Sequence, residues 1–286
     1  MRHPGSKGKI SRHIVPLIPY DCLYYHEPFL GLGYVYKRLR LVGRSFKDYF
    51  LSDLFQPLVN YHLACQGDQT YGDIVERLIE LRSMLLPESE HEEEIRAEFE
   101  ECCYRLRFWH DPLDIIFVGC YANGQWLGRH RRDFASFHPM FFRGGISVLT
   151  PEKVLAWREL LAPATIQCLD AMEWLRALNE REDAYDHFVY IDPPYVTRDL
   201  GGRNRFQMYQ HDWLTLEPQL ELLELLKNAR FRFILSMGDS PYTREWYVRD
   251  KTLGFHAYTV PAVNSGKRRK ATRVHQEEWL ILNFAA

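Results

Sequence analysis

The sequence predicts a mixed α/β fold in which a mostly parallel sheet is covered by helices. Three observations predict it: short apolar runs alternate with helix-like stretches, a glycine turn follows the first run, and acidic residues end later runs. With 286 residues, the chain has the length of about two domains, or of one domain with a large insertion. Its 46% hydrophobic and 26% charged residues are ordinary for a globular protein with a sizeable core.

The first 66 residues predict the opening of a nucleotide-binding unit. Cys22–Tyr25 is an apolar, strand-like run, and the turn at residues 27–33 follows it. A helix is expected over Tyr34–Leu41, and a second strand over Tyr49–Leu51 runs into Asp53. Strand, glycine turn, helix and acid-terminated strand are the parts with which such α/β units begin.

The middle of the chain interrupts this alternation and indicates an insertion at residues 67–162. Residues 71–86 have apolar side chains at helical spacing, and Pro87 ends the pattern. Residues 88–101 hold eight glutamates against one arginine, and aromatic and basic residues follow from Arg105 to Arg143. We therefore expect an inserted, mainly helical domain, with residues 1–66 and 163–286 forming the other domain.

The alternation of strands and helices resumes after Pro163. Asp170 ends the first strand of this half, and Asp192 directly follows the second. The expected elements are strands at 165–169, 187–191 and 230–235, helices at 171–179 and 216–227, and a closing pair of strands at 255–260 and 278–284.

Asp192-Pro193-Pro194-Tyr195 is the most informative motif because it directly follows an apolar strand. Two prolines fix the backbone and remove two donors, so that carbonyl oxygens are left without local partners. A carboxylate, a carbonyl and an aromatic face suit a flat ring that carries an amino group. Hydrogen bonds from that amine to Asp192 and to the Pro193 carbonyl make its lone pair available to attack a methyl group. A proline-rich turn without a function is the alternative.

Several motifs occur in one order: His3-Pro4-Gly5-Ser6-Lys7, Glu27-Pro28-Phe29-Leu30-Gly31-Leu32-Gly33, Ser52-Asp53, Leu169-Asp170, Asp192–Tyr195, Phe206 with Tyr209, Ser236–Asp239, and Asn264-Ser265-Gly266. In this order they resemble the Dam-like DNA adenine-N6 methyltransferases, over most of the chain outside the insertion. The resemblance implies a Rossmann-like sheet with helices on both faces. It also implies that the insertion is the target-recognition domain. Met237 stands where the family commonly has Asn.

The resemblance implies methyl transfer from S-adenosylmethionine to N6 of a flipped adenine in double-stranded DNA, with Asp192, Pro193, Pro194 and Tyr195 as the catalytic motif. The implied cofactor-binding residues are His3, Lys7, Glu27, Phe29, Gly31, Gly33, Asp53, Asp170 and Asp192. Glycines let the backbone approach the cofactor closely, and an acid about 20 residues further on can accept ribose hydroxyls. Asp53 and Asp170 have an alternative role as helix N-caps, and Lys7 as a solvated lysine.

Two basic runs are candidates for DNA contact. One contains Arg129, Arg131 and Arg132, with Asn123 shortly before it, and the other is Lys267-Arg268-Arg269. The resemblance adds Phe206 and Tyr209. Such runs neutralise phosphates without reading sequence, although either run could be a solvated loop. Residues 88–101 contribute −7 to the formal net charge of −2, so that the rest of the chain carries +5.

Neither the composition nor the cysteine and histidine spacing indicates a membrane span or a metal site. No stretch approaches the roughly 18 consecutive apolar residues of a membrane span, and no Cys/His spacing indicates a metal. A neutral thioether is the leaving group, so the reaction needs no metal. We therefore expect a monomeric, cytoplasmic enzyme. Methylation of RNA adenine or of cytosine N4 is one alternative, and a catalytically silent DNA-binding module is another.

Overall fold

The structure is a computed structural model that describes residues 7–83, 92–105, 111, 113–114, 150–195, 216–262 and 276–285. These residues divide into two compact units, one formed by residues 53–168 and the other by residues 7–52 and 169–285. The division differs from the predicted insertion at 67–162, which stays a prediction. None of the helices in the described ranges is long and apolar enough to cross a bilayer.

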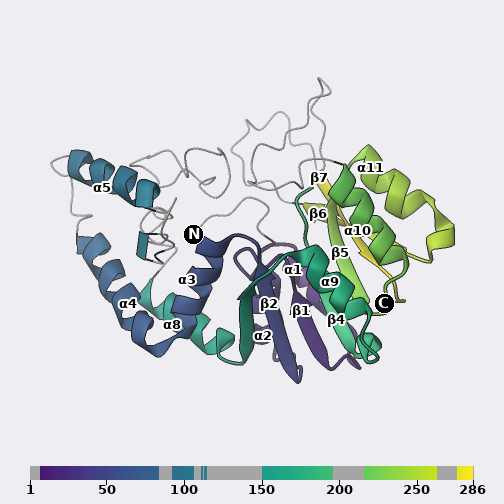
Figure 1. Cartoon of the computed structure of the whole chain (residues 1–286), viewed down its shortest axis with the longest axis horizontal. Coiled ribbons are helices and arrows are strands. Elements are labelled where there is room, and N and C mark those ends of the chain that lie inside the picture. The colour runs from purple at the N-terminus through teal and green to yellow at the C-terminus, as the bar shows by residue number, and fades with distance from the viewer. Residues whose placement is uncertain are drawn as a thin grey trace. The chain divides into compact units, whose positions relative to one another are not determined.

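The second unit holds the sheet predicted from the sequence (Figure 1). Its elements, in chain order, are α1 (Ser11–Ile14), η1 (Val15–Leu17), β1 (Tyr24–Glu27), α2 (Tyr34–Leu41), β2 (Asp48–Asp53), α9 (Ala171–Asn179), η2 (Ala184–Asp186), β4 (His187–Ile191), α10 (Glu217–Lys227), β5 (Arg232–Gly238), α11 (Pro241–Thr243), η4 (Arg244–Arg249), η5 (Lys251–Leu253), β6 (His256–Ala262) and β7 (Gln276–Leu282). From β2 onward the strand order is β2-β1-β4-β5-β7-β6. The pairs β2-β1, β1-β4 and β4-β5 are parallel, whereas β7 is antiparallel to both β5 and β6.

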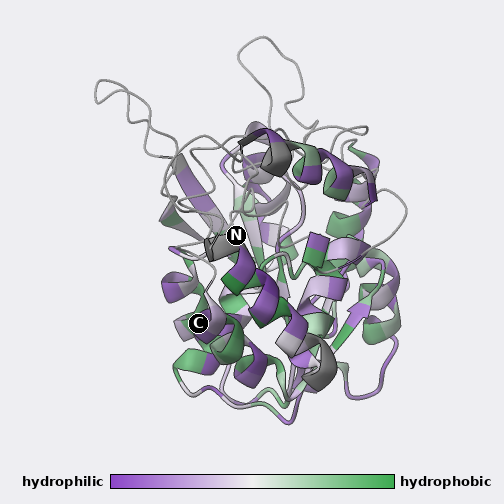
Figure 2. Ribbon diagram, turned by 90° about the vertical axis from the view of Figure 1, so that its left-hand side faces the viewer, coloured by the Kyte–Doolittle hydropathy of each residue, from purple (hydrophilic) through white to green (hydrophobic). Residues whose placement is uncertain are grey.

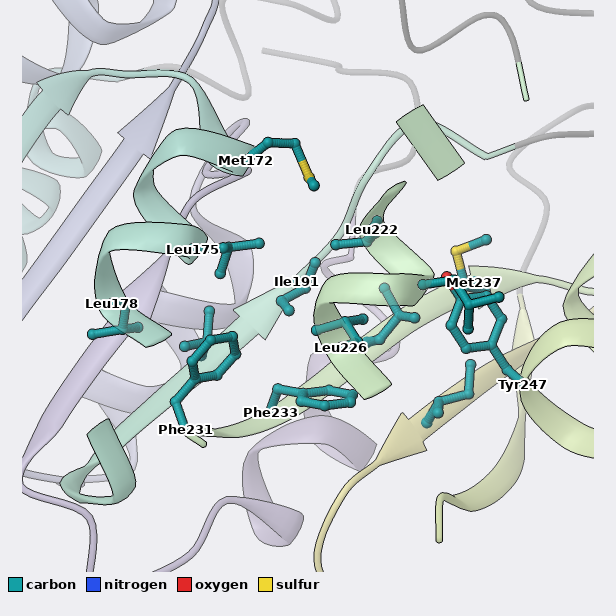
Figure 3. Packing of buried hydrophobic residues seen from close by; sticks show 14 residues of the cluster. Met172, Leu175, Leu178, Ile191, Leu222, Leu226, Phe231, Phe233, Met237 and Tyr247 are labelled. Carbon is teal, nitrogen blue, oxygen red and sulfur yellow. The ribbon is translucent and has the colours of Figure 1, made fainter. Parts of the chain in front are cut away.

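Helices cover both faces of this sheet, as expected for parallel strands. On one face, apolar side chains of α9 and α10 pack against β4 and β5, and Figure 3 shows Leu175 and Leu226 pointing toward Ile191 and Phe233. On the other face, Tyr36 of α2 packs against Tyr25 of β1. Every residue of β4 is buried. The predicted α/β fold is therefore confirmed.

The first unit is mainly helical. It contains α3 (Gln56–Gln66), α4 (Asp68–Ser83), α5 (Glu92–Arg105), α8 (Pro151–Leu161) and β3 (Ala164–Cys168). Trp157 of α8 donates a hydrogen bond from Nε1 to Nδ1 of His62 on α3, at 3.1 Å. The Gln66 amide donates to the carbonyls of Leu161 and Ala164, and so fixes the chain between α8 and β3. Figure 2 shows that the helices carry both hydrophobic and hydrophilic residues, the pattern of helices with one face on a core.

Candidate active site

The candidate site lies where the strand order reverses direction. β1 has β2 on one side and β4 on the other, so the connections that leave β1 and β4 turn away in opposite directions. In open α/β sheets, ligands bind outside the carboxyl ends of the strands at such a point. The glycine turn leaves the carboxyl end of β1, and Asp192–Tyr195 leaves the carboxyl end of β4.

The glycine turn is built from residues that need unusual backbone angles. Gly31 has φ 51° and Gly33 has φ 63°, both in the left-handed region that glycine adopts without steric cost. The Gly33 amide donates to the Leu30 carbonyl at 2.7 Å, and the Leu30 amide donates to the Ser52 carbonyl at 2.9 Å. Gly33 is also the N-cap of α2. The turn therefore presents bare backbone directly before a helix N-terminus.

Glu27 is the buried anchor of this turn. Its Oε2 accepts hydrogen bonds from the Tyr25 hydroxyl at 2.7 Å and from the Tyr36 amide in the first turn of α2 at 3.0 Å. Burial raises the pKa of this carboxyl to about 8, although both hydrogen bonds act in the opposite direction. Glu27 therefore shapes the loop from inside the protein.

Four side chains from three separate segments meet beside Asp192. The Lys7 ammonium lies 2.9 Å from Asp192 Oδ1 and 3.0 Å from Glu278 Oε1, and it also donates to the Tyr195 hydroxyl. The Tyr195 oxygen lies 3.0 Å from Asp192 Oδ1 and 2.7 Å from Glu278 Oε1. We call Lys7, Asp192, Tyr195 and Glu278 the carboxylate cluster. The Lys7 ammonium, which was predicted to meet the cofactor carboxylate, is thus bound to the predicted catalytic motif in this structure.

Burial and charge act against each other in the carboxylate cluster. Burial raises the pKa of Asp192 to about 6, and the negative charge of Glu278 adds to this effect, while Lys7 opposes it. The pKa of Lys7 is also raised, because the attraction of Asp192 and Glu278 outweighs the cost of burying its charge. At neutral pH the cluster therefore holds an ammonium beside ionised Asp192.

The proline loop leaves two acceptors available next to this cluster. The Gln219 side chain on α10 donates to the Pro194 carbonyl at 2.6 Å. Within the described part of the chain, no hydrogen-bond partner is found for the Pro193 carbonyl or for Asp192 Oδ2, since Lys7 and Tyr195 both contact Oδ1. One carboxylate oxygen and one carbonyl oxygen thus stand ready for a ligand with two hydrogens.

Tyr195 fits its place because Gly238, near the end of β5, has no side chain. A Cβ atom added at Gly238 would lie 2.9 Å from Tyr195 Cδ2, closer than real contacts allow. Met237, which directly precedes Gly238, is buried in the hydrophobic cluster shown in Figure 3. The ring of Tyr195 is thus held by its hydroxyl at one end and by a glycine beside it.

Asp170 and Asp53 are the two other acids predicted to bind the cofactor. Asp170 begins a helix, and Asp53 ends a strand. Asp170 is the N-cap of α9, and its Oδ1 accepts from the Met172 and Glu173 amides at 2.8 and 3.0 Å. The N-cap role considered for Asp170 is confirmed. Asp53 ends β2 and belongs to the first unit, where its Oδ1 accepts from the Phe55 amide at 2.9 Å. Phe55, rather than Asp53, is the N-cap of α3.

Comparison with known proteins identifies the family. The family model of the D12 class N6 adenine-specific DNA methyltransferases matches residues 3–102 and 150–264. The chain belongs to this family. It is an adenine-specific DNA methyltransferase, which confirms the function that the motifs predicted.

The relatives of this methyltransferase are distant but cover most of its length. The DNA adenine methylase of Escherichia coli (strain K12) is 26% identical over 259 residues, which are 87% of this chain and 84% of the relative. The type II methyltransferase M1.LlaDCHI of Lactococcus lactis subsp. cremoris is 22% identical over 285 residues, covering 98% and 93%. A solved rRNA methyltransferase, aviRa from Streptomyces viridochromogenes, overlaps 96% of this chain and 82% of its own at 16% identity, but its TM-score is only 0.37.

Ten predicted site residues of the methyltransferase lie outside the described residues. They are His3, Asn123, Arg129, Arg131, Arg132, Phe206, Tyr209, Lys267, Arg268 and Arg269. Their roles therefore stay predictions. Among the residues that the structure does describe, no group of three or more His, Cys, Asp or Glu side chains could hold a metal ion.

Three residues of the site were missed in the sequence: Glu278, Gln219 and Gly238. Glu278 was expected only as the start of a strand, yet it is an acid at the edge of an apolar run, and a buried acid needs a partner. That signal could have identified it. Gln219 carries no comparable signal, and Gly238 lies in the Ser236–Asp239 motif but was given no role. Both roles depend on which residues the fold brings beside Pro194 and Tyr195.

Proposed function

We propose that this methyltransferase takes its methyl group from S-adenosylmethionine and acts on an adenine flipped out of double-stranded DNA. When bound, the cofactor supplies an electrophilic methyl on a sulfonium, and a neutral thioether is the leaving group. The proposed residues are those already described at the carboxyl ends of β1 and β4, together with Asp53 and Asp170.

The donor set at these strand ends fits S-adenosylmethionine. Gly31 and Gly33 present backbone without side chains at the start of α2, which suits close approach of a cofactor. Asp170 uses one carboxylate oxygen, Oδ1, for both capping bonds. Its Oδ2, which has no other partner in the described ranges, suits the amino group of the cofactor's adenine. Asp53 suits the ribose hydroxyls.

One observation carries the proposal for the substrate amine: among the described residues, Asp192 Oδ2 and the Pro193 carbonyl have no hydrogen-bond partner, whereas Asp192 Oδ1, the Tyr195 hydroxyl and the Pro194 carbonyl are engaged. The adenine N6 amine has two hydrogens, one for each acceptor. Donating both draws the nitrogen from a planar toward a tetrahedral geometry and localises its lone pair. A weak nucleophile is thereby oriented for attack on the methyl carbon.

The negative charge of Asp192 then stabilises the positive charge that N6 acquires as the new N–C bond forms. A stacked base cannot reach this loop, so it must leave the helix at a cost of a few kcal/mol. Stacking on Tyr195 offsets about 1–3 kcal/mol of that cost. The hydroxyl of Tyr195 is bound in the carboxylate cluster, which fixes the plane of the ring.

DNA contact is assigned to the insertion and the second basic run. The family model leaves residues 103–149 unmatched, which is consistent with a recognition segment particular to this chain. We assign phosphate contacts to Arg129, Arg131, Arg132 and Lys267–Arg269, and a monomer as the active form. Reversing the charge at Arg131 and Arg132 should weaken DNA binding and flatten its salt dependence, and an unchanged salt slope would remove this run from the interface.

The decisive experiment incubates the wild-type protein with S-adenosylmethionine labelled on its methyl group and with unmethylated plasmid DNA or RNA. The DNA is then digested to nucleosides and separated. We expect label in N6-methyladenine from duplex DNA. Label in N4-methylcytosine, label only in RNA, or no transfer from this donor would contradict the proposal.

A further inference from the structure

Glu278 lies in the site but has no role in the reaction described so far. It projects from β7 and is separated from Tyr195 by 83 residues of sequence. Only 10% of its side chain is exposed, and 7% of the side chain of Lys7. Burying a carboxylate is costly, so its contacts with Lys7 and Tyr195 must compensate.

The hydrogens of the carboxylate cluster can be counted. The Lys7 ammonium has three N–H donors, and three oxygens lie within hydrogen-bonding reach: Asp192 Oδ1, Glu278 Oε1 and the Tyr195 hydroxyl. The Tyr195 hydroxyl has a single hydrogen, but it lies within 3.0 Å of both Asp192 Oδ1 and Glu278 Oε1. It can donate to only one of them at a time. The second short O···O contact is satisfied when one of the two carboxyl groups carries a proton.

The charges lead to the same conclusion. One ammonium and two carboxylates give the carboxylate cluster a net charge of −1. A single added proton makes the cluster neutral and completes its hydrogen bonds. Methylation of a primary amine releases one such proton directly beside Asp192.

We propose that Glu278 is the final acceptor of the proton that leaves adenine N6, and that the Tyr195 hydroxyl carries it there from Asp192. This inference rests on the proposed function and deepens it. Glu278 acts through Tyr195 and does not touch the substrate, so it is a proton-accepting and positioning residue.

The proton moves from N6 first to Asp192 and then, through Tyr195, to Glu278. The N6–H bond breaks and an O–H bond forms on Asp192, so that N6 keeps the electron pair and becomes a neutral secondary amine. The proton arrives on Asp192 Oδ2, whereas Tyr195 contacts Oδ1, so the protonated carboxyl group first turns about its Cβ–Cγ bond. Asp192 then passes the proton to the Tyr195 oxygen while Tyr195 passes its own proton to Glu278 Oε1. Asp192 is again a carboxylate, Tyr195 is again a phenol, and Glu278 is a carboxylic acid. Lys7 stays an ammonium throughout.

Other titratable groups surround this path. Tyr190 on β4 interacts electrostatically with Asp192 and Glu278 and shares a hydrogen bond with Ser236. Glu27 interacts with Asp192 from β1. Burial raises the pKa of Tyr190 well above its usual value, and that of Tyr195 likewise. Both phenols therefore stay protonated, and Tyr195 can act only by exchanging protons.

The experiment compares Glu278→Gln with Glu277→Gln in the full-length protein. Glu277 is the neighbouring residue on β7 and is exposed, so the same substitution there is a matched control. Glutamine keeps an acceptor oxygen for Lys7 and Tyr195 but cannot take a proton at neutral pH. We expect Glu278→Gln to lower the single-turnover methylation rate by at least about tenfold, while KM for DNA stays unchanged. Glu277→Gln should match the wild type.

The pH dependence tests whether Glu278 is negatively charged beside Asp192, as a proton acceptor must be before the reaction. Removing the charge of Glu278 should lower the pKa of Asp192, because Glu278 contributes to raising it. The acid limb of the rate profile should therefore move to lower pH in Glu278→Gln. Carbon-13 NMR of the Asp192 carboxyl should show the same shift without any turnover. A wild-type rate and an unmoved acid limb in Glu278→Gln would overturn the inference.

Tyr195→Phe provides a second variant in case Glu278→Gln does not fold, because it keeps the ring and removes the hydroxyl. We expect Tyr195→Phe to reproduce the rate loss of Glu278→Gln. The double variant, which carries both substitutions, should be no slower than the slower single variant. A wild-type rate in Tyr195→Phe, or additive losses, would overturn the relay. If the wild type itself forms no N6-methyladenine, the proposed function fails, which is a distinguishable result.

Discussion

Gly238 and Tyr195 lie so close that only a residue without a side chain fits beside the tyrosine ring. A Cβ at Gly238 would lie 2.9 Å from Cδ2 and 3.5 Å from Cε2 of Tyr195. Because the Tyr195 hydroxyl is held by Glu278 and Asp192, the ring cannot move aside without breaking those bonds. The end of β5 therefore sets the position of the residue assigned to stack on the flipped base.

Gly238→Ala should displace the Tyr195 ring and lower kcat by about 100-fold, the cost of misplacing a reacting group by roughly 1 Å. Gly72→Ala on α4 is the control, because nothing lies within 4 Å of the added methyl group. That variant should keep full activity and gain up to about 1 kcal/mol of stability. Equal activity of the two variants in a DNA methylation assay would contradict the account of Gly238.

Gln219→Met should loosen the proline loop by removing the donor to the Pro194 carbonyl. Buried Gln219 Oε1 has no partner in the described structure, so losing the amide also removes an unsatisfied acceptor. We therefore expect the free energy of unfolding to change by less than about 1.5 kcal/mol while kcat falls about tenfold. Leu220→Met, at the exposed neighbouring position, should change neither quantity. A drop in stability without a drop in kcat would assign Gln219 to the core alone.

The sequence predicted those parts of the site whose signals are local. The helix Ala171–Asn179 and the strand His187–Ile191 have the predicted bounds, since an N-cap acid begins the helix and a run rich in apolar and aromatic residues defines the strand. β5 was predicted at 230–235 but spans Arg232–Gly238, because its pairing with β7 extends it. Glu278, an acid at the edge of an apolar run, could have been identified as a buried acid, but its place beside Tyr195 depends on long-range strand pairing, which the spacing of residues in a sequence does not reveal.

Glu27→Gln should change the pH dependence of stability. The pKa of Glu27 is about 8 in the folded protein against 4.5 normally, so the folded state binds this proton more tightly than the unfolded chain does. The wild type therefore loses this contribution as the pH rises from about 4.5 to 8. Glutamine keeps an acceptor for Tyr25 and Tyr36 and does not ionise. The Tm of Glu27→Gln relative to wild type should increase between about pH 5 and 8. A constant Tm difference would contradict the burial of an ionisable Glu27.

His26 should stay neutral well below its usual pKa. Its Nδ1 accepts from the Trp174 indole at 3.2 Å, and its Nε2 lies 2.7 Å from His187 Nδ1, so a fixed tautomer completes the chain of hydrogen bonds. Burial is the main cause that lowers the pKa of His26 well below 6.5, and that of His187 is also lowered. Stability should consequently fall as the pH drops below 6.5, because the unfolded chain takes up these protons first.

Nitrogen-15 NMR of the His26 ring tests this prediction. Between about pH 7.5 and 5.5, Nδ1 should keep the shift of an unprotonated nitrogen and Nε2 that of a protonated one. Titration of both nitrogens near pH 6.5 in the folded protein would contradict the buried pair.

In the proposed mechanism, Asp192 orients the adenine amine and stabilises its charge. The most direct test measures single-turnover methylation of duplex DNA by Asp192→Asn, with Asp48→Asn as a control at the exposed opposite end of the sheet. We expect Asp192→Asn to lose at least about 100-fold in rate while its affinity for DNA stays within about threefold of wild type, and Asp48→Asn to match the wild type. Wild-type methylation by Asp192→Asn would contradict the account.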